Sequence, residues 1–346
     1  MSTSQKLLKN TFIYTIGNLG SRILSFALVP LYSFFLSKSE LGIYDLILTS
    51  TSLLIPIITL QIADAAYRWL LEKNQDAQKK VSAISNGLLV VTINSFIFLF
   101  ICFIASFFVH FEYLIHSFLF VFFATLMTFL QQITRGLGNT KLYSAAGILN
   151  TILLIIFSVV FFAWFKYKLG GLLIAVTLAN AITACTLIVA GGLKKYIDFS
   201  QVARKEIKAM MQYSWPLIPN AIGWWLINEI NRFIILFYLG VDANGIFAIA
   251  IRFPSLMIAA NSIFMLSWQD HAIAAEEGGA VKNASYSKIF STYMVLQFTM
   301  VIVLTSVSKY AVKWIIDPKF FEERQYMPLL YLSVALYNFS SFYVIA

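Results

Sequence analysis

The sequence predicts an all-α polytopic membrane protein, and three properties of the 346-residue chain support this class. Hydrophobic residues make up 60% of the chain, charged residues make up 12%, and the mean hydropathy is +0.79. The charged share is about half that of a typical soluble domain. A soluble fold of this size cannot hide so much apolar surface, so the composition excludes a soluble enzyme, a nucleic-acid-binding protein and a disordered protein.

Membrane-spanning helices are predicted in the apolar runs between charged or glycine-rich breaks, at about 20 residues per span. The first run is too long for the apolar part of a cleavable signal peptide, so we expect an uncleaved span there. About ten spans are predicted in all, at residues 11–36, 42–66, 81–109, 114–134, 142–165, 172–191, 215–239, 243–268, 289–309 and 327–346.

One long connection divides these spans into two groups. Residues 192–214 are polar and basic with scattered apolar residues, which predicts a surface helix. We therefore expect a six-helix N-terminal bundle at 1–191, a cytoplasmic basic linker at 192–214, and a C-terminal bundle of four spans at 215–346.

The distribution of lysine and arginine predicts the orientation. With the N-terminus inside, fifteen of these residues fall on inner segments and seven on outer loops. This positive-inside bias accounts for the net charge of +9 and predicts a multi-pass protein of the inner membrane with a cytoplasmic N-terminus. Cys102 and Cys185 both lie inside apolar runs and the three histidines are scattered, so we expect no disulfide framework, metal site or cofactor.

An internal repeat appears when the chain is shifted by 203 residues. The segment S-E-L-G-I-Y-D-L at 39–46 then aligns with D-A-N-G-I-F-A-I at 242–249, without a gap in the two flanking spans. Six spans separate the copies, and an even number gives both halves the same orientation, related by an axis along the membrane normal. The pairs that become identical include Gly20/Gly223, Phe34/Phe237, Gly42/Gly245, Ile43/Ile246 and Ser52/Ser255.

The repeat also sets an expected length. Six spans fill about 203 residues, so two full halves need about 406, whereas the chain has 346. We therefore expect that spans 11 and 12 are missing from the second repeat, either because the sequence is a fragment of a longer reading frame or because it is a short form.

Short motifs distributed over nearly the whole chain together resemble the pattern of one family. They are K-L-L-K-N-T at 6–11, G-x-x-x-S-R-I-L-S at 17–25, R-G-L-G-N-T-K-L-Y at 135–143, Y-S-W-P-L-I-P-N at 213–220, W-W-L-I-N-E-I-N-R-F at 224–233 and G-I-F-A-I-A-I-R at 245–252. In this order they resemble the O-antigen and capsule flippases of the multidrug/oligosaccharidyl-lipid/polysaccharide exporter superfamily.

The resemblance implies two parallel six-helix bundles around a central cavity. It implies that the protein moves an undecaprenyl-diphosphate-linked oligosaccharide from the inner to the outer leaflet by alternating access, for O-antigen, capsule or exopolysaccharide assembly. The implied partners are this lipid-linked glycan, membrane lipids and the polysaccharide polymerase machinery, with no nucleic acid. Family members have twelve or fourteen spans, whereas about ten are predicted here.

Two arginines at membrane depth are the main candidates for substrate binding. Arg22 and Arg252 lie near the middle of predicted spans 1 and 8, and neither has an acidic residue three or four positions away. A charge at such a depth costs at least about 2.5–3.5 kcal/mol unless a partner or a wet cavity offsets it. Guanidinium groups bind phosphate oxygens through two hydrogen bonds, so a cationic cavity for a lipid diphosphate is one interpretation. The alternative is an ion pair with an acid on another helix, for which Asp45, Asp64 and Glu229 are available. Arg232, Asn18 and Asn228 complete the predicted substrate-binding set.

Four further residues are candidates for coupling or gating: Glu229, Asp64, Arg68 and Asp45. Glu229 stands three residues before Arg232, a spacing that predicts an intrahelical ion pair, and its alternative role is to take up a coupled proton or cation. Asp64 and Arg68 stand four residues apart near the inner end of span 2, as a satisfied interfacial pair or as a cytoplasmic gate. Asp45 lies near the outer end of the same span, either as an outer gate or as a solvated interfacial acid.

Two other function classes remain as alternatives. A cation-coupled multidrug exporter of the same superfamily would need unpaired carboxylates in mid-span for cationic drugs, whereas the unpaired arginines favour an anionic substrate. A membrane glycan polymerase or glycosyltransferase would need paired carboxylates, a D-x-D motif or a large outer catalytic loop. The chain has no D-x-D motif, and its longest outer loop, about 310–326, is short.

Overall fold

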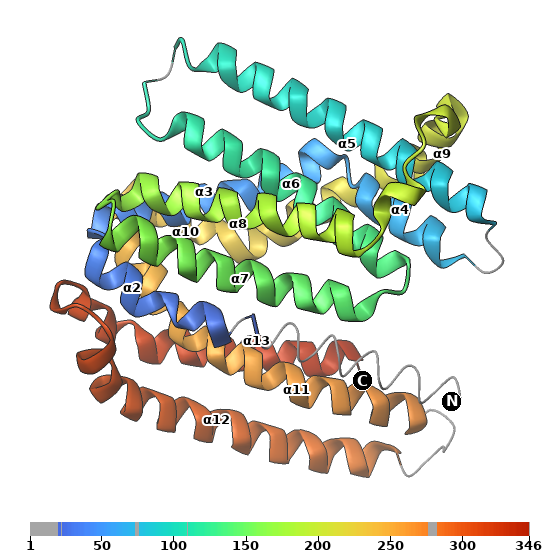
Figure 1. Ribbon diagram of the computed structural model, residues 1–346. Helices are drawn as coiled ribbons and strands as arrows, with labels where there is room; N and C mark the ends of the chain where they lie inside the picture. The colour runs from blue at the N-terminus through green and yellow to red at the C-terminus, as the bar shows by residue number, and fades with distance from the viewer. Residues whose placement is uncertain (1–19, 22, 73–75, 109, 276–281, 346) are drawn as a thin grey trace.

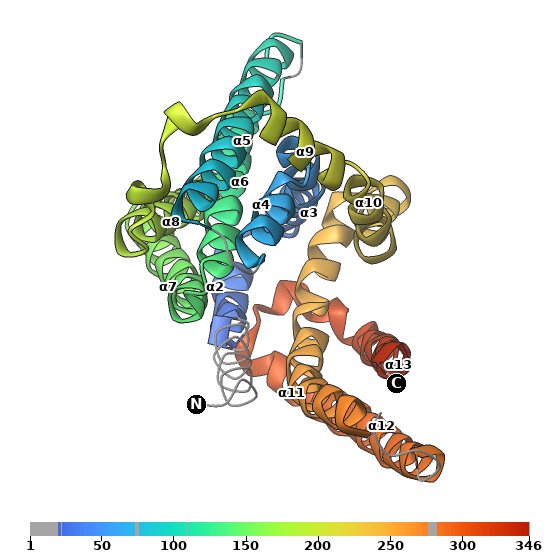
Figure 2. The same ribbon diagram turned by 90° about the vertical axis from the view of Figure 1, so that its right-hand side faces the viewer.

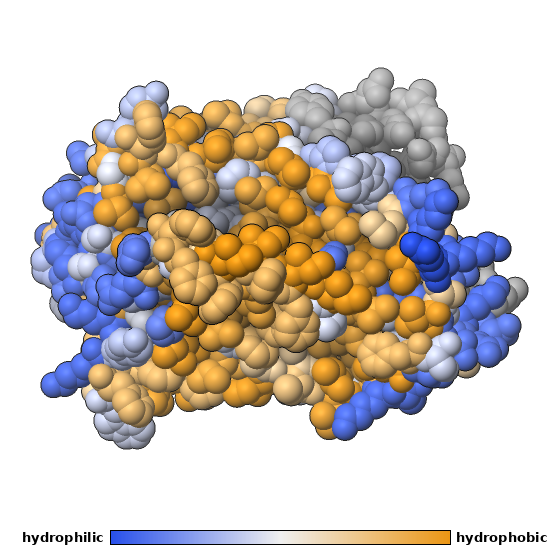
Figure 3. All heavy atoms as spheres, turned by 90° about the horizontal axis from the view of Figure 1, so that it is seen from above, coloured by the Kyte–Doolittle hydropathy of each residue, from blue (hydrophilic) through white to orange (hydrophobic). Residues whose placement is uncertain are grey.

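The computed structural model describes residues 20–345 except 22, 73–75, 109 and 276–281. Within these residues the chain forms helices and turns and contains no strand. The long helices run side by side (Figure 1), and a broad apolar band lies between two hydrophilic ends of the molecule (Figure 3). A belt of this kind is what a lipid bilayer covers.

The helices follow one another with short connections. Their bounds are α2 (Leu28–Phe35), α3 (Lys38–Thr59), α4 (Ile62–Leu71), α5 (Ala77–Ala105), α6 (Leu114–Gly136), α7 (Thr140–Ala163), α8 (Lys168–Ala190), the 3-10 helices η1 (Leu193–Tyr196) and η2 (Phe199–Gln201), α9 (Arg204–Ser214), α10 (Leu217–Ala250), α11 (Arg252–Ala275), α12 (Lys282–Ile315), the 3-10 helix η4 (Pro318–Gln325) and α13 (Met327–Ile345). We call the end that carries residues 192–214 the linker end, and the opposite end, with the start of α3 and η4, the hairpin end.

The predicted class of all-α polytopic membrane protein is confirmed. Seven stretches of the described residues are long and apolar enough to cross a membrane: Lys38–Thr59, Ala77–Ala105, Leu114–Gly136, Thr140–Ala163, Lys168–Ala190, Arg204–Ser262 and Ser287–Ile315. Each predicted span from the second to the ninth overlaps one of them. The seventh lies within Arg204–Ser262, and the eighth, predicted at 243–268, overlaps the end of the same stretch. The first and tenth predicted spans extend past the residues that the structure describes.

The second predicted span is two helices rather than one. Leu60 and Gln61 adopt left-handed backbone conformations, with φ of 50° and 54°, which end α3 and let α4 start in a new direction. Such conformations cost non-glycine residues about 1 kcal/mol or more each. The break places Ile62 and Ala66 of α4 in a buried apolar cluster at the linker end, and this burial offsets the cost. Neither residue is a glycine or proline, so the sequence carried no turn signal at this point.

The eighth predicted span is also interrupted. The chain kinks at Gly240, with φ of 84°, where a break between spans seven and eight was expected. It breaks again at Ile251, so that Arg252 becomes the first residue of α11. Pro254 favours this boundary, because proline lacks an N–H and fits the first turn of a helix but not its interior.

The linker is less helical than predicted, since only its second half, α9, is an α-helix. Two buried polar residues of α5 hold its first half against the bundle. The backbone N–H of Asp198 donates to Ser85 Oγ at 2.8 Å, and that of Ala203 donates to Asn86 Oδ1 at 3.0 Å. These bonds satisfy backbone groups that an irregular segment leaves unpaired.

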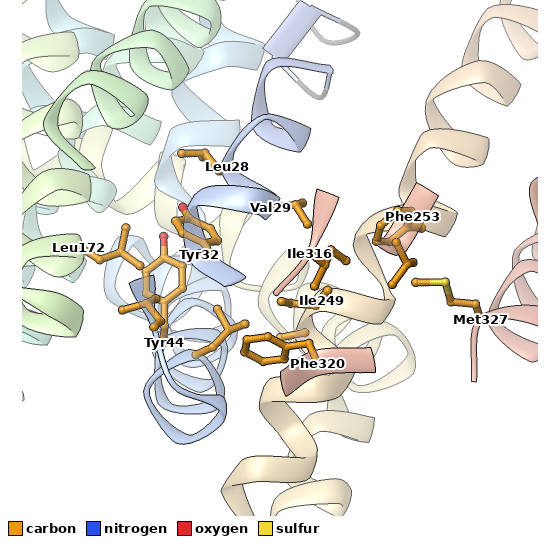
Figure 4. Packing of buried hydrophobic residues seen from close by; sticks show 14 of the residues in the cluster. Leu28, Val29, Tyr32, Tyr44, Leu172, Ile249, Phe253, Ile316, Phe320 and Met327 are labelled. Atoms are coloured by element: carbon orange, nitrogen blue, oxygen red, sulfur yellow. The ribbon is translucent and has the colours of Figure 1, made fainter. Parts of the chain in front are cut away.

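The helices lie in two groups when the molecule is viewed from the linker end (Figure 2). Helices α11, α12 and α13 form one group, α2 to α8 form the other, and α10 packs along α3. The largest apolar core joins the groups at the hairpin end. Figure 4 shows Tyr32, Tyr44 and Leu172 of the α2–α8 group on one side of this core and Phe253 and Met327 on the other. Ile249, Ile316 and Phe320 lie between them. The two groups are therefore closed against each other at this end.

A buried hydrogen-bonded cluster holds α11, α12 and α13 together. Asn261 Oδ1 accepts from Tyr293 Oη at 2.5 Å and from Gln297 Nε2 at 3.1 Å, and Gln297 Oε1 accepts from Asn338 Nδ2 at 3.1 Å. All four residues are buried. Small polar side chains of this kind associate helices within a membrane.

Replacing Asn261 with leucine is expected to destabilise the C-terminal group. The change leaves Gln297 Nε2 without its acceptor and leaves the Tyr293 hydroxyl only its longer bond of 3.4 Å to the Asn338 carbonyl, at a cost of about 1–3 kcal/mol. Thr299→Val is the matched control, since Thr299 is exposed on α12 and bonds only to the Val295 carbonyl of its own helix. Denaturant unfolding in detergent micelles measures the difference, and equal stability of the two variants would contradict it.

Candidate functional site

Two glycines related by the 203-residue shift touch each other at the hairpin end. A Cβ atom on Gly42 would collide with the Val241 carbonyl, and one on Gly245 would collide with the Lys38 carbonyl. Val241 is itself the shifted equivalent of Lys38, so the two collisions are the same contact seen from each half. Buried Asn244 adds a hydrogen bond from its Nδ2 to the Gly42 carbonyl at 3.0 Å. The contact therefore joins positions that the 203-residue repeat makes equivalent.

A cavity of about 290 Å³ lies next to this contact, between α3 on one side and α10 and the start of α11 on the other. At a rise of about 1.5 Å per residue, its α3 residues lie roughly 10 to 20 Å from the start of that helix, which places the cavity at membrane depth. Its lining follows the repeat, because six of nine residues form three pairs at the 203-residue shift. The pairs are Leu48/Ile251, Thr49/Arg252 and Ser52/Ser255, and the other three are Asp45, Glu229 and Arg232.

Arg232 carries the ion pairs of this cavity. Its Nε lies 2.8 Å from Asp45 Oδ2 on α3, and its Nη1 pairs with Glu229 one turn earlier on α10. The side chains of Arg232 and Asp45 are only 13% and 7% exposed. The predicted Glu229–Arg232 pair is thus present. The interpretation of Asp45 as a solvated acid is wrong, because α10 covers it and supplies its counter-charge.

Arg252 lines the same cavity without an ion pair. It is half-buried, and no described residue forms a salt bridge or hydrogen bond with its guanidinium. The acids considered as alternative partners are engaged elsewhere: Asp45 and Glu229 with Arg232, and Asp64 with Gln132. An unpaired guanidinium lining a cavity at this depth is what the anion-binding interpretation of Arg252 expects.

The predicted pair of Asp64 and Arg68 does not form. Asp64 Oδ1 accepts a hydrogen bond from Gln132 Nε2 at 3.2 Å, and the Arg68 guanidinium lies 4.4 Å from the centre of the Tyr213 ring. The reason is tertiary, since α6 supplies Gln132 and α9 supplies Tyr213. Spacing along α4 permits the pair, but the neighbouring helices offer each side chain another partner.

The other predicted site residues lie outside the cavity or outside the described chain. Asn228 is exposed and donates to the Trp224 carbonyl of its own helix at 2.7 Å, so the structure does not bring it into the cavity. Arg22 and Asn18 both lie outside the described residues. No group of three or more His, Cys, Asp or Glu side chains in the described part of the chain is placed to hold a metal ion.

Polar residues of α3 were missed as candidates. Trp225 Nε1 donates to the Thr49 carbonyl at 2.9 Å and to Ser52 Oγ at 3.1 Å, which fixes α10 against the cavity wall. Ser52 and Ser255 are identical in the repeat alignment and both line the cavity. Their identity across the repeat was the signal that could have identified them.

The buried ion pair is expected to contribute more to stability than an exposed one. In a double-mutant cycle, Asp45→Asn and Arg232→Gln should show a coupling energy of about 1–3 kcal/mol, because either single change leaves a buried group without its partner. The exposed pair of Lys38 and Glu322, with an N–O distance of 3.0 Å, is the matched comparison and should give less than about 1 kcal/mol. Denaturation in micelles measures both cycles, and equal couplings would argue against a special role for the buried pair.

Several solved structures share the arrangement of helices seen in this chain. The chain is similar to an inward-facing multidrug resistance MATE family transporter of the MOP superfamily, with a TM-score of 0.71, 13% identity, and coverage of 94% of this chain and 78% of that one. It is also similar to a MATE protein in complex with MaD3S, with a TM-score of 0.64, 13% identity, and coverage of 96% and 79%. The Vibrio cholerae MATE transporter VcmN in its bent form gives a TM-score of 0.56, 13% identity, and coverage of 96% and 81%. The fold of this chain is therefore similar to that of the MATE transporters.

The family follows from the sequence. A family model described as "Polysaccharide biosynthesis protein" matches residues 7–308, which is most of the chain. The chain belongs to this family, and the resemblance drawn from its motifs is confirmed. No curated protein matches it in sequence.

Proposed function

We propose that the protein is a flippase for a lipid-diphosphate-linked oligosaccharide of O-antigen, capsule or exopolysaccharide assembly. The observation that carries the proposal is the Arg252 guanidinium, which lines a cavity between the halves while Arg232 holds both carboxylates of that cavity. A free guanidinium in a low-dielectric setting favours an anion over a cation. The family's description as polysaccharide biosynthesis proteins supports a glycan substrate.

The size of the cavity bears on which part of the substrate it binds. At about 290 Å³ it lies at the lower end of ligand pockets, which run from about 300 to 1,000 Å³. It suits a diphosphate group, with the glycan extending between the helix groups and the polyprenyl chain lying in the bilayer. We place the linker end in the cytoplasm of an inner-membrane protein, as the lysine and arginine distribution predicts. Further partners under this proposal are membrane lipids and the polymerase machinery.

A cation-coupled multidrug exporter is the second candidate, because the solved structures that share this fold include multidrug transporters. In that case Glu229 would be the acidic group, since its side chain is 32% exposed and it lines the cavity. Its pairing with Arg232 counts against binding a cationic drug, because the positive charge of a drug would compete with the guanidinium.

The decisive experiment is done in cells of the source strain that lack this gene. The lipid-diphosphate glycan is radiolabelled and its leaflet determined by access to a membrane-impermeant enzyme. A flippase predicts accumulation in the inner leaflet, reversed by the intact gene. Normal outer-leaflet glycan together with increased sensitivity to cationic drugs would overturn the proposal in favour of drug export.

A further inference from the structure

A second groove lies on α9, apart from the central cavity. It has a volume of about 760 Å³ and is lined by residues of α9 together with Trp215, which follows it. The lining consists of Arg204, Ile207, Lys208, Met211, Gln212 and Trp215. It thus combines two cationic side chains with apolar and aromatic ones, and the proposed transport function makes no use of it.

The groove occupies one face of the helix. Arg204, Lys208, Met211 and Trp215 follow one another at spacings of four, three and four residues, which aligns them along a single stripe. The opposite face packs on the bundle, where Met210 is buried and the Tyr213 ring lies 5.8 Å from the Trp69 ring. Arg204, Lys208 and Trp215 are exposed on the outward face, whereas Met211 is half-buried and packs against the apolar cluster at the linker end.

The stripe is cationic at one end and apolar at the other, as a lipid is charged at its headgroup and apolar along its chain. The two cations come first, and the apolar Met211 and Trp215 come last, directly before α10 begins at Leu217. Trp215 is 63% exposed, and exposed apolar side chains continue along α10 at Trp224 and Ile227. Tryptophan concentrates at the boundary between headgroups and acyl chains. A molecule with an anionic headgroup and an apolar chain would fit the groove in this direction.

The charge of the region supports the same ligand. Residues 192–214 contain five Lys and Arg residues and two acidic residues. Within the described residues, neither Arg204 nor Lys208 has an ion-pair partner, and both are exposed. Basic amphipathic helices next to a membrane span attract anionic phospholipids by charge and hold them by apolar burial.

We propose that the α9 groove binds an anionic phospholipid of the leaflet at the linker end, with the headgroup phosphate on Arg204 and Lys208 and an acyl chain along Met211 and Trp215. The site is independent of the transported substrate, so it stands or fails separately from the proposed flippase activity. A lipid headgroup and free phosphate would bind the two cations in the same way. Only a lipid has an acyl chain that would also contact the apolar half of the groove, and this difference separates the two ligands.

The test is a titration of the full purified chain in detergent, followed by native mass spectrometry. Dioleoyl phosphatidylglycerol is the anionic probe, dioleoyl phosphatidylcholine the zwitterionic one, and inorganic phosphate the headgroup alone. We expect phosphatidylglycerol to bind at least about tenfold more tightly than either. The double variant Arg204→Gln/Lys208→Gln should lose about tenfold or more of that affinity, and Trp215→Ala should weaken phosphatidylglycerol but not phosphate.

The matched control is Lys194→Gln/Lys195→Gln, which removes the same charge from exposed positions of the same linker outside the groove. It should leave phosphatidylglycerol binding unchanged, and the thermal midpoint of each variant shows that it is folded. If the control lost as much phosphatidylglycerol affinity as the groove variant, the binding would depend on the overall positive charge of the linker and not on the groove. That result would overturn the proposal. Equal binding of phosphatidylcholine, or phosphate competing as well as the lipid, would overturn it too.

Discussion

Arg252→Ala is expected to reduce glycan translocation about 30-fold or more while leaving the protein folded in the membrane. The guanidinium lines the cavity between the halves with no ion pair from the described residues. Removing one partner of a buried charge-assisted contact with a ligand costs about 2–5 kcal/mol, and every 1.4 kcal/mol is about a factor of ten. The measurement is the rate at which labelled lipid-diphosphate glycan reaches the outer leaflet.

Two variants separate the loss of charge from the loss of geometry. Arg252→Lys keeps the charge but not the planar fork, so it should restore part of the rate. Lys141→Ala, at an exposed position away from the cavity, removes a positive charge and should transport normally. The assignment of Arg252 to the substrate site would be contradicted if Arg252→Ala were fully active. It would also be contradicted if Arg252→Lys and Lys141→Ala lost activity equally.

Thermal stability distinguishes this role from a structural one. If Arg252 were held in an ion pair, truncating it would leave a buried acid unpaired and destabilise the protein by about 3–5 kcal/mol. The two acids that line the same cavity, Asp45 and Glu229, pair with Arg232 instead. We therefore expect Arg252→Ala to unfold at the same temperature as the native chain or higher, which is typical of residues kept for function at a cost in stability.

The fold could be predicted from the sequence because the bilayer imposes a simple pattern. Long apolar runs separated by charged or glycine-rich turns mark helices of fixed length, and every helix from α5 to α8 lies close to its predicted position. The break at Leu60 and Gln61 escaped prediction because both residues are ordinary helix formers. The break is favoured because it lets apolar side chains of α4 pack into the buried cluster at the linker end. The other members of that cluster are distant in the sequence, so this packing could not be read from the local pattern.

The candidate site was predictable to the extent that its contacts are local or follow the repeat. Glu229 and Arg232 are three residues apart, and their pairing follows from helix geometry. The partner of Arg232 on α3 is 187 residues away and could not be read from spacing. Asp64 and Arg68 show the opposite case. Their spacing permits an ion pair, but Asp64 bonds to a side chain of α6 and Arg68 lies over a ring of α9 instead.

Gly42→Val is expected to stop the hairpin end from closing. The added side chain would meet the Val241 carbonyl, which is backbone and cannot rotate away. Overpacking of this kind costs about 1–3 kcal/mol, which shifts a two-state equilibrium by about 5- to 140-fold. The proposed alternating-access mechanism requires this end to close in each cycle, so under that proposal we expect translocation to fall by a similar factor.

A cysteine reporter in the cavity shows which state accumulates. In a background with Cys102 and Cys185 replaced by serine, Ser52→Cys should react with a membrane-impermeant thiol reagent from the hairpin side much faster when Gly42→Val is present. Gly223→Val is the matched control, since a Cβ at Gly223 has nothing within 4 Å. Gly245→Val should reproduce the effect of Gly42→Val, because the repeat makes the two positions equivalent. Reactivity that stays low in both variants would mean that the glycine contact serves packing alone and that closure is controlled elsewhere.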